Sequence, residues 1–207
     1  MSAEGKPLRL GILLSGRGSN FLAIAKNIRE GRLPNVEIAV VISNVAAARD
    51  LNLPTSLFVS KGRPRAEHDA DLIGCLRQHN VDLVCLAGYM RLLSPGFIAA
   101  FPNRILNIHP SLLPAFPGLD AQQQAFDYGV KVVGCTVHFV DEHLDQGAII
   151  LQRSILVLET DNAPALADRI LVEEHIAYSE AIARVASCQY EIQGRRYVRR
   201  ATAQHES

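Results

Sequence analysis

The segment LRLGILLSGRGSN, residues 8–20, joins a short apolar run to a loop that contains two glycines. An apolar run of this length, bounded by turn residues, predicts a buried strand over 8–14. Residues 21–30 follow with a helical pattern, with capping residues at Ser19 and Asn20 and with Gly31 as the C-terminal stop. Strand, loop and helix in this order predict the first unit of an α/β sheet.

The alternation of apolar runs and helical segments continues along the chain. Strands are predicted over 36–43, 57–59, 81–87 and 104–108, and helices over 46–51, 65–79, 95–101 and 122–128. In the second half, only a short loop separates two strands, over 134–140 and 148–158, which favours antiparallel pairing. A long helix follows from residue 161 to about residue 186, and then a short hairpin over 190–200.

These segments predict one α/β domain of 207 residues, with its core over about 8–186 and a hairpin-like, frayed tail over 187–207. The central sheet is expected to be parallel in its N-terminal half and mixed toward its C-terminal half. Helices are expected on both faces of the sheet.

The composition is that of an ordinary globular protein, with 21 Lys and Arg against 21 Asp and Glu and a formal net charge of zero. This balance gives no electrostatic reason to expect a nucleic-acid or membrane partner, and the apolar runs are too short to span a bilayer. The N-terminus has no signal-peptide layout, so we expect a cytoplasmic protein, either a monomer or a homodimer. The widely spaced cysteines predict reduced core residues and no metal site: Cys75, Cys85, Cys135 and Cys188.

The loop over 15–20 has the features of a phosphate site. Its glycines let backbone N–H groups turn inward, and the N-terminus of the following helix favours negative charge. The loop lacks the third glycine of the dinucleotide fingerprint and the lysine of a P-loop, so the expected ligand is a monophosphate. The alternative is a tight strand-to-helix turn that needs glycine only for a positive φ.

Asn107 and His109 lie at the end of the predicted strand over 104–108, immediately before Pro110. Residues i and i+2 of an extended segment point to the same face, and Pro110 disfavours a helical conformation at His109. An amide and an imidazole on one face can stabilise an oxyanion and move a proton, as acyl-type transfer requires. For an isolated pair the alternative is structural, since buried polar groups generally satisfy nearby backbone.

A further polar group lies in the loop over 141–147, which holds three acids and a histidine. Asp145 is the candidate, because a carboxylate beside an imidazole orients it and raises its basicity. The alternative is ordinary solvated loop chemistry. His138, in the strand before this loop, is a supporting candidate, although a lone strand histidine is more often a hydrogen-bonded core residue.

Taken together, these residues resemble the folate-dependent formyltransferases. The run over 107–114 and the downstream segment 145–147 carry the resemblance, which extends over about 8–186 with the motifs in the same order. Other matching stretches are 43–44, 87–94, 116–118, 137–140 and 173–175. The loop over 15–20 narrows the resemblance to members that formylate glycinamide ribonucleotide in purine synthesis. It implies a Rossmann-like formyltransferase fold, with 10-formyltetrahydrofolate as co-substrate and no metal.

The resemblance also implies a role for each matching position. Asn107 and His109 would stabilise the oxyanion of a tetrahedral intermediate, and Asp145 would hold His109 and help to move a proton. The residues implied in ribonucleotide binding are Gly18, Ser19, Asn20, Gly88, Pro110 and Glu174. Those implied in folate binding are Arg65, Met90, Arg91, Leu92, Leu93, Asn107, Val140, Asp141 and Asp145. The family also places a cis peptide before Pro114, which the sequence permits.

The sequence departs from the family pattern at Arg17, Ala115 and Asp120, and these departures bear on how the substrate approaches the site. The segment over 46–53 looks shorter than usual.

Three alternative functions stay open. Methionyl-transfer-RNA formyltransferase shares the 107–114 run but carries an additional RNA-binding domain. Formyltetrahydrofolate hydrolase usually has a second histidine where Pro110 stands, and a catalytically silent nucleotide- or folate-binding module would not require the catalytic trio.

Overall fold

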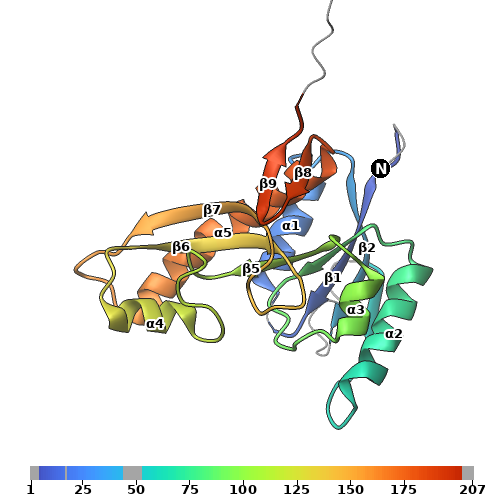
Figure 1. The fold of residues 1–207 in the computed structure, drawn as a ribbon, viewed down its shortest axis with the longest axis horizontal. Helices are drawn as coiled ribbons and strands as arrows, with labels where there is room; N and C mark the ends of the chain where they lie inside the picture. Colours follow the sequence, from blue (N-terminus) through green and yellow to red (C-terminus); the bar gives the residue numbers. More distant parts are fainter. Residues whose placement is uncertain (1–4, 17, 44–52, 202–207) are drawn as a thin grey trace, which may run out of the picture.

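The computed structural model describes residues 5–16, 18–43 and 53–201, and places its strands in a single nine-stranded sheet (Figure 1). The sheet order is β3-β2-β1-β4-β5-β6-β7-β9-β8. The helix predicted over 46–51 lies outside the described residues, as do Arg17 and all but the last residue of the segment over 46–53.

The elements follow the predicted alternation, with ends that differ from the predicted ones by two residues or fewer. The strands are β1 (Leu8–Leu14), β2 (Val36–Ser43), β3 (Thr55–Leu57), β4 (Leu83–Leu86), β5 (Ile105–His109), β6 (Val132–Phe139), β7 (Ile149–Leu156), β8 (Tyr190–Gln193) and β9 (Arg196–Arg199). The helices are α1 (Ser19–Arg29), α2 (Arg65–Gln78), α3 (Pro95–Ala100), α4 (Ala121–Tyr128) and α5 (Ala163–Ala186).

The first five strands are parallel, and β6 is antiparallel to both β5 and β7. The hairpin of β8 and β9 joins the sheet through a single parallel pair, Ile149 with Arg196. The predicted change from a parallel to a mixed sheet is therefore confirmed. Because β1, β4 and β5 are parallel neighbours, the loops that follow them open at the same edge of the sheet.

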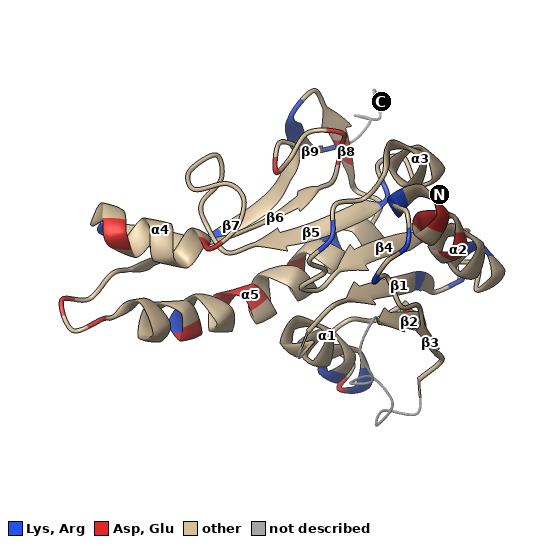
Figure 2. Ribbon diagram, turned by 90° about the horizontal axis from the view of Figure 1, so that it is seen from below, with Lys and Arg blue, Asp and Glu red and all other residues tan. Residues whose placement is uncertain are grey.

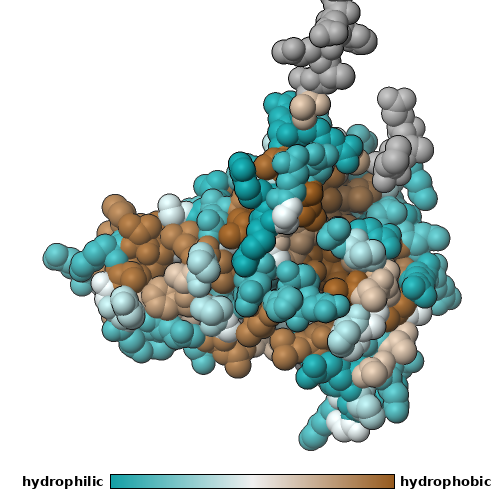
Figure 3. Space-filling view, viewed as in Figure 1, coloured by the Kyte–Doolittle hydropathy of each residue, from teal (hydrophilic) through white to brown (hydrophobic). Residues whose placement is uncertain are grey.

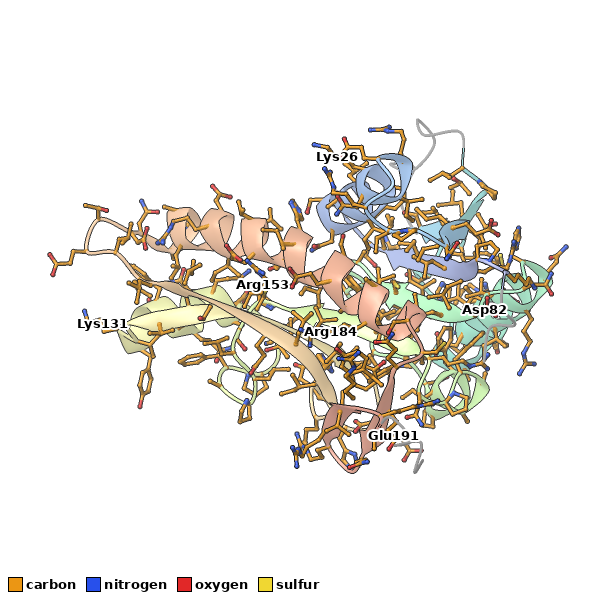
Figure 4. The ribbon with its side chains drawn as sticks, turned by 90° about the horizontal axis from the view of Figure 1, so that it is seen from above. Lys26, Asp82, Lys131, Arg153, Arg184 and Glu191 are labelled. Atoms are coloured by element: carbon orange, nitrogen blue, oxygen red, sulfur yellow. The ribbon has the colours of Figure 1, made fainter. Side chains whose placement is uncertain are left out.

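Helices cover both faces, so successive residues of a central strand enter different cores. In β1, Ile12 packs with α1 and α5, whereas Leu13 packs with α2 and α3. Figure 2 shows α1 and α5 together on one face. Two arginines join α5 to β7 in Figure 4: Arg153 donates to Glu173, and Arg184 donates to the Ile150 carbonyl at 3.1 Å.

Tyr178 links α5 to two neighbouring strands of the sheet. Its ring is fully buried, and its hydroxyl lies 3.0 Å from the Leu86 carbonyl oxygen and 3.1 Å from that of Leu106. Those carbonyls belong to β4 and β5, so one helix side chain holds both strands. Burial raises the pKa of Tyr178 well above its usual value, which keeps the hydroxyl a donor.

Two local predictions were wrong. The N-cap of α1 is Gly18, in a left-handed conformation with φ 68° and no side-chain cap, because Asn20 reaches Glu174 instead. Gly31, with φ 72°, does follow the C-cap residue as predicted. Cys188 is exposed after the end of α5, whereas the other three cysteines are buried.

Candidate active site

The side chains of Asn107, His109 and Asp145 meet at the C-terminal end of β5. Asn107 and His109 lie two residues apart on β5, and β6 pairs antiparallel with that strand so that His138 is opposite Asn107. Asp145 comes from the loop between β6 and β7 and has only 8% of its side chain exposed. The structure thus brings the predicted catalytic trio and the supporting His138 together.

His109 is held by one backbone acceptor. Its Nε2 lies 2.8 Å from the Phe116 carbonyl oxygen, and a carbonyl can only accept, so Nε2 carries the hydrogen. The other ring nitrogen, Nδ1, lies 3.6 Å from Asp145 Oδ2. His109 therefore presents Nδ1 to the carboxylate.

His138 is a neutral acceptor in this arrangement. Its Nδ1 donates to the Phe139 carbonyl at 2.8 Å, which leaves the Nε2 lone pair facing Asn107 Nδ2 at 3.3 Å. Burial lowers the pKa of His138 below its usual value, although the Phe139 carbonyl and Asp145 oppose that shift. One amide hydrogen of Asn107 is therefore fixed on His138, and the second remains for another acceptor.

Asp145 lies between the two imidazoles. Its Oδ2 accepts a 2.9 Å hydrogen bond from the Gly118 backbone N–H, and its Oδ1 lies 3.7 Å from His138 Nε2. The loop can fold this way because residue 147 is glycine: a Cβ there would lie 1.8 Å from the Phe139 carbonyl oxygen. This is the same carbonyl that binds His138.

The loop after β1, of which residues 15, 16 and 18 are described, starts at the same edge of the sheet as the trio. Ser15 ties it to the loop after β4, because its N–H donates to the Gly88 carbonyl at 3.2 Å and its Oγ accepts from Met90 N–H at 3.2 Å. Asn20 Nδ2 donates to Glu174 Oε2 at 2.8 Å. Burial raises the pKa of Glu174, although the hydrogen bond from Asn20 lowers it. The N-cap of α1 has no side-chain cap hydrogen bond, and the N-terminus of a helix favours an anion.

Most of the residues implied in folate binding lie in the segment after β4, at the start of α2 and just after β6. Met90 and Leu92 are apolar side chains that are 71% and 57% exposed. Arg91 donates to the Ser60 and Arg63 carbonyls at 2.8 and 3.1 Å, and Arg65 begins α2 two residues later. Leu93 and Val140 are only partly exposed and pack against the core under α2 and α3, while Asp141 caps the turn that leads to His143.

Several contacts that support the site could not be predicted from the sequence. Phe116 and Gly118 bind His109 and Asp145 through backbone atoms, and Asp69 accepts a 2.6 Å hydrogen bond from the Ser94 N–H at the end of the 89–93 segment. Backbone contacts leave no residue-type signal. Of the departures from the family pattern, Ala115 offers its carbonyl to Ser111, and Asp120 is the N-cap of α4. The peptide between Leu113 and Pro114 is cis.

Within the described ranges, no group of three or more His, Cys, Asp or Glu side chains is arranged to hold a metal ion. Likewise, none of the helices described has the length and hydropathy needed to cross a membrane. The side chains that meet at the site are one amide, two imidazoles and one carboxylate, and backbone groups of Phe116 and Gly118 contact them.

A Rossmann-like sheet with an amide, an imidazole and a carboxylate at one strand end is an architecture for acyl-type transfer. The sequence profile described as "Formyl transferase" matches residues 8–182, and the chain belongs to that family. It is 41% identical over 180 residues to phosphoribosylglycinamide formyltransferase of Bacillus subtilis, covering 84% of this chain and 92% of the relative.

Other relatives are longer. The trifunctional purine biosynthetic protein adenosine-3 of Homo sapiens is 42% identical over 195 residues, and the match covers 90% of this chain but only 19% of the human protein. The match to the Chironomus tentans protein of the same name covers 14% of that protein. The chain therefore spans less than a fifth of these multifunctional relatives.

Solved structures share the whole fold. Glycinamide ribonucleotide transformylase 1 from Symbiobacterium toebii is 50% identical with a TM-score of 0.90, over 96% of this chain and 97% of that one. A formyltetrahydrofolate deformylase from Pseudomonas syringae is 25% identical with a TM-score of 0.89, over 94% of this chain and 66% of that one.

Proposed function

We propose that this chain transfers the formyl group of 10-formyltetrahydrofolate to the amine of glycinamide ribonucleotide, in purine biosynthesis. The observation that carries the proposal is the convergence of Asn107, His109 and Asp145, with His109 Nδ1 3.6 Å from Asp145 Oδ2. The names of the relatives that match nearly end to end support the choice of substrates.

In the proposed reaction the amine nitrogen of the ribonucleotide attacks the formyl carbon, and a tetrahedral oxyanion forms. The free N–H of Asn107 and a protonated His109 Nδ1 donate to that oxyanion, and each such donor contributes about 3 kcal/mol of transition-state stabilisation in comparable enzymes. Asp145 lies beside His109, holds the imidazole in place and accepts the amine proton. That proton passes to the folate N10 through water, the C–N10 bond breaks, and formylglycinamide ribonucleotide and tetrahydrofolate result.

The two substrates approach from opposite sides of the trio. The phosphate binds at the backbone N–H groups of Gly18, Ser19 and Asn20, where the dipole of α1 favours an anion. Glu174 accepts hydrogen bonds from the ribose, and Gly88 and Pro110 line the glycinamide portion.

The folate slot is formed by the exposed side chains of Met90 and Leu92, together with Leu93, Arg91, Val140 and Asp141. Arg65 faces the glutamate tail of the folate. We further propose a cytoplasmic location, small-molecule partners only, and a monomer or homodimer.

Hydrolysis of formyltetrahydrofolate is the second candidate, because the deformylase from Pseudomonas syringae has the same fold. One assay separates the candidates: consumption of 10-formyltetrahydrofolate with and without glycinamide ribonucleotide. Formyl transfer predicts turnover only with the nucleotide and one formylated product per tetrahydrofolate. Formate release without nucleotide would support the hydrolase, and nucleotide binding without turnover would support a silent binding module.

A further inference from the structure

The loop over 115–120 contacts two members of the trio through its backbone. The Phe116 carbonyl oxygen lies 2.8 Å from His109 Nε2, and the Gly118 N–H donates to Asp145 Oδ2 at 2.9 Å. These two groups are separated by a single residue along the chain. Any displacement of this loop therefore changes the setting of both the imidazole and the carboxylate.

The loop adopts a backbone conformation that needs support. Phe116 has φ 50° and Asp120 has φ 54°, in the left-handed region that side chains other than glycine rarely adopt. Ser111, which is 2% exposed, donates its hydroxyl to the Ala115 carbonyl at 2.5 Å and so fixes the chain just before Phe116. The position of the Phe116 carbonyl then depends on its ring.

The Phe116 ring is held from two sides. It packs against the core cluster that lines α5, and the ring of Tyr128 contacts it edge-on with centroids 5.8 Å apart and planes at 65°. Tyr128 is the last residue of α4 and is 80% exposed. Figure 3 shows that this end of the molecule, around α4 and the start of β6, presents apolar side chains at the surface, Val132 among the exposed ones. A tyrosine so exposed adds little to the core, and its described ring contact is with Phe116.

We propose that Phe116, clamped by Tyr128, is a positioning residue for His109; the catalytic part of this inference rests on the proposed formyl transfer. The clamped ring fixes the Phe116 carbonyl, the carbonyl accepts the Nε2–H of His109 and sets the ring orientation, and Nδ1 is thereby aimed at Asp145 and, once protonated, donates to the formyl oxygen. Without the clamp, the loop takes other positions and His109 samples both tautomers and other ring orientations.

The first test removes the Tyr128 ring, which contacts Phe116 at the surface of the protein. Tyr128→Ser is expected to lower kcat for formyl transfer about tenfold, with KM for both substrates within about twofold and an unchanged unfolding midpoint, because small misplacements of catalytic groups act on the chemical step. Tyr128→Phe, which keeps the ring, restores the wild-type kcat. Tyr190→Ser is the matched control, since it removes one ring of the stacked Tyr190–Tyr197 pair in the β8–β9 hairpin and leaves kcat unchanged. A wild-type kcat in Tyr128→Ser would overturn the proposal, as would a loss confined to KM.

The second test does not depend on activity. Phe116→Gly suits the positive φ and removes the ring, so the chain folds while the loop is freed. The ¹⁵N chemical shifts of the His109 ring at neutral to alkaline pH are expected to report a single Nε2–H tautomer in the wild type and a mixture in Phe116→Gly. A single unchanged tautomer in the variant would overturn the clamp, whatever reaction the protein catalyses. Absence of nucleotide-dependent turnover in the wild type would instead contradict the proposed function and leave the tautomer measurement to decide this inference.

Discussion

The Asn20 side-chain amide donates a 2.8 Å hydrogen bond to Glu174 Oε2 and joins the first turn of α1 to α5 across 154 residues of sequence. Both side chains are buried. The bond ties the glycine loop after β1 to the helix that, through Tyr178, also holds β4 and β5. One contact thus holds the start of α1, proposed to bind the phosphate, close to Glu174, proposed to bind the ribose.

Asn20→Ala is therefore expected to raise the Kd for glycinamide ribonucleotide and to lower the free energy of unfolding by about 1–3 kcal/mol, because Glu174 loses its partner in a buried site. Titration calorimetry and urea unfolding measure the two effects. Asn27→Ala is the control, since Asn27 also joins α1 to α5, through a 2.6 Å hydrogen bond to Ser179. Asn27→Ala should lower the free energy of unfolding and leave the nucleotide Kd unchanged. Equal Kd values for the two variants would contradict a role of Asn20 in phosphate binding.

Glu174→Gln is expected to change how stability depends on pH. Burial raises the pKa of Glu174 above its ordinary value of 4.5, so the unfolded chain ionises first and the wild type loses stability as pH rises from about 4.5 through the folded-state pKa. Glutamine has no such transition and still accepts the hydrogen bond from Asn20. The stability of the variant relative to wild type should therefore increase between pH 4.5 and pH 8 in urea unfolding series. A difference that is constant over this range would refute the shift.

Gly147→Ala is expected to destabilise the protein by more than about 2 kcal/mol and to lower kcat, because its Cβ would lie 1.8 Å from the Phe139 carbonyl oxygen that holds His138. Gly74→Ala, within α2, is the matched control: nothing lies within 4 Å of its Cβ position. That change should stabilise the helix by about 0.5–1 kcal/mol. Thermal unfolding and kcat of both variants check the contrast, and similar behaviour of the two would be inconsistent with the close approach.

The architecture could be predicted from the sequence because each helix or strand has its own spacing of apolar residues and is bounded by turn or capping residues. Apolar runs such as Leu83–Leu86 are too short for helices, and the adjoining β6 and β7 segments leave no room for a crossover helix. The shared face of Asn107 and His109 follows from strand geometry alone. These features are local, so one sequence suffices to find them.

What could not be predicted depends on distant or backbone partners. Asn20 is of a residue type that often caps helices, but its side chain donates to Glu174, which only the folded chain brings near it. The Phe116 carbonyl and the Gly118 N–H exist at almost every residue, so no residue type marks them as holding His109 and Asp145. Cys188 has the hydrophobic character of a core residue, but it follows the end of α5, where the chain lies at the surface.

The most direct test of the central claim is kcat of Asp145→Asn for transfer from 10-formyltetrahydrofolate to glycinamide ribonucleotide, measured beside the nucleotide Kd. The substitution keeps the shape of the side chain but removes the proton acceptor beside His109, so kcat is expected to fall at least about 100-fold while Kd stays within about twofold. Glu142→Gln, an exposed acid in the same loop, should retain the wild-type kcat. A kcat for Asp145→Asn close to that of the wild type would contradict the assignment of Asn107, His109 and Asp145 as the formyl-transfer site.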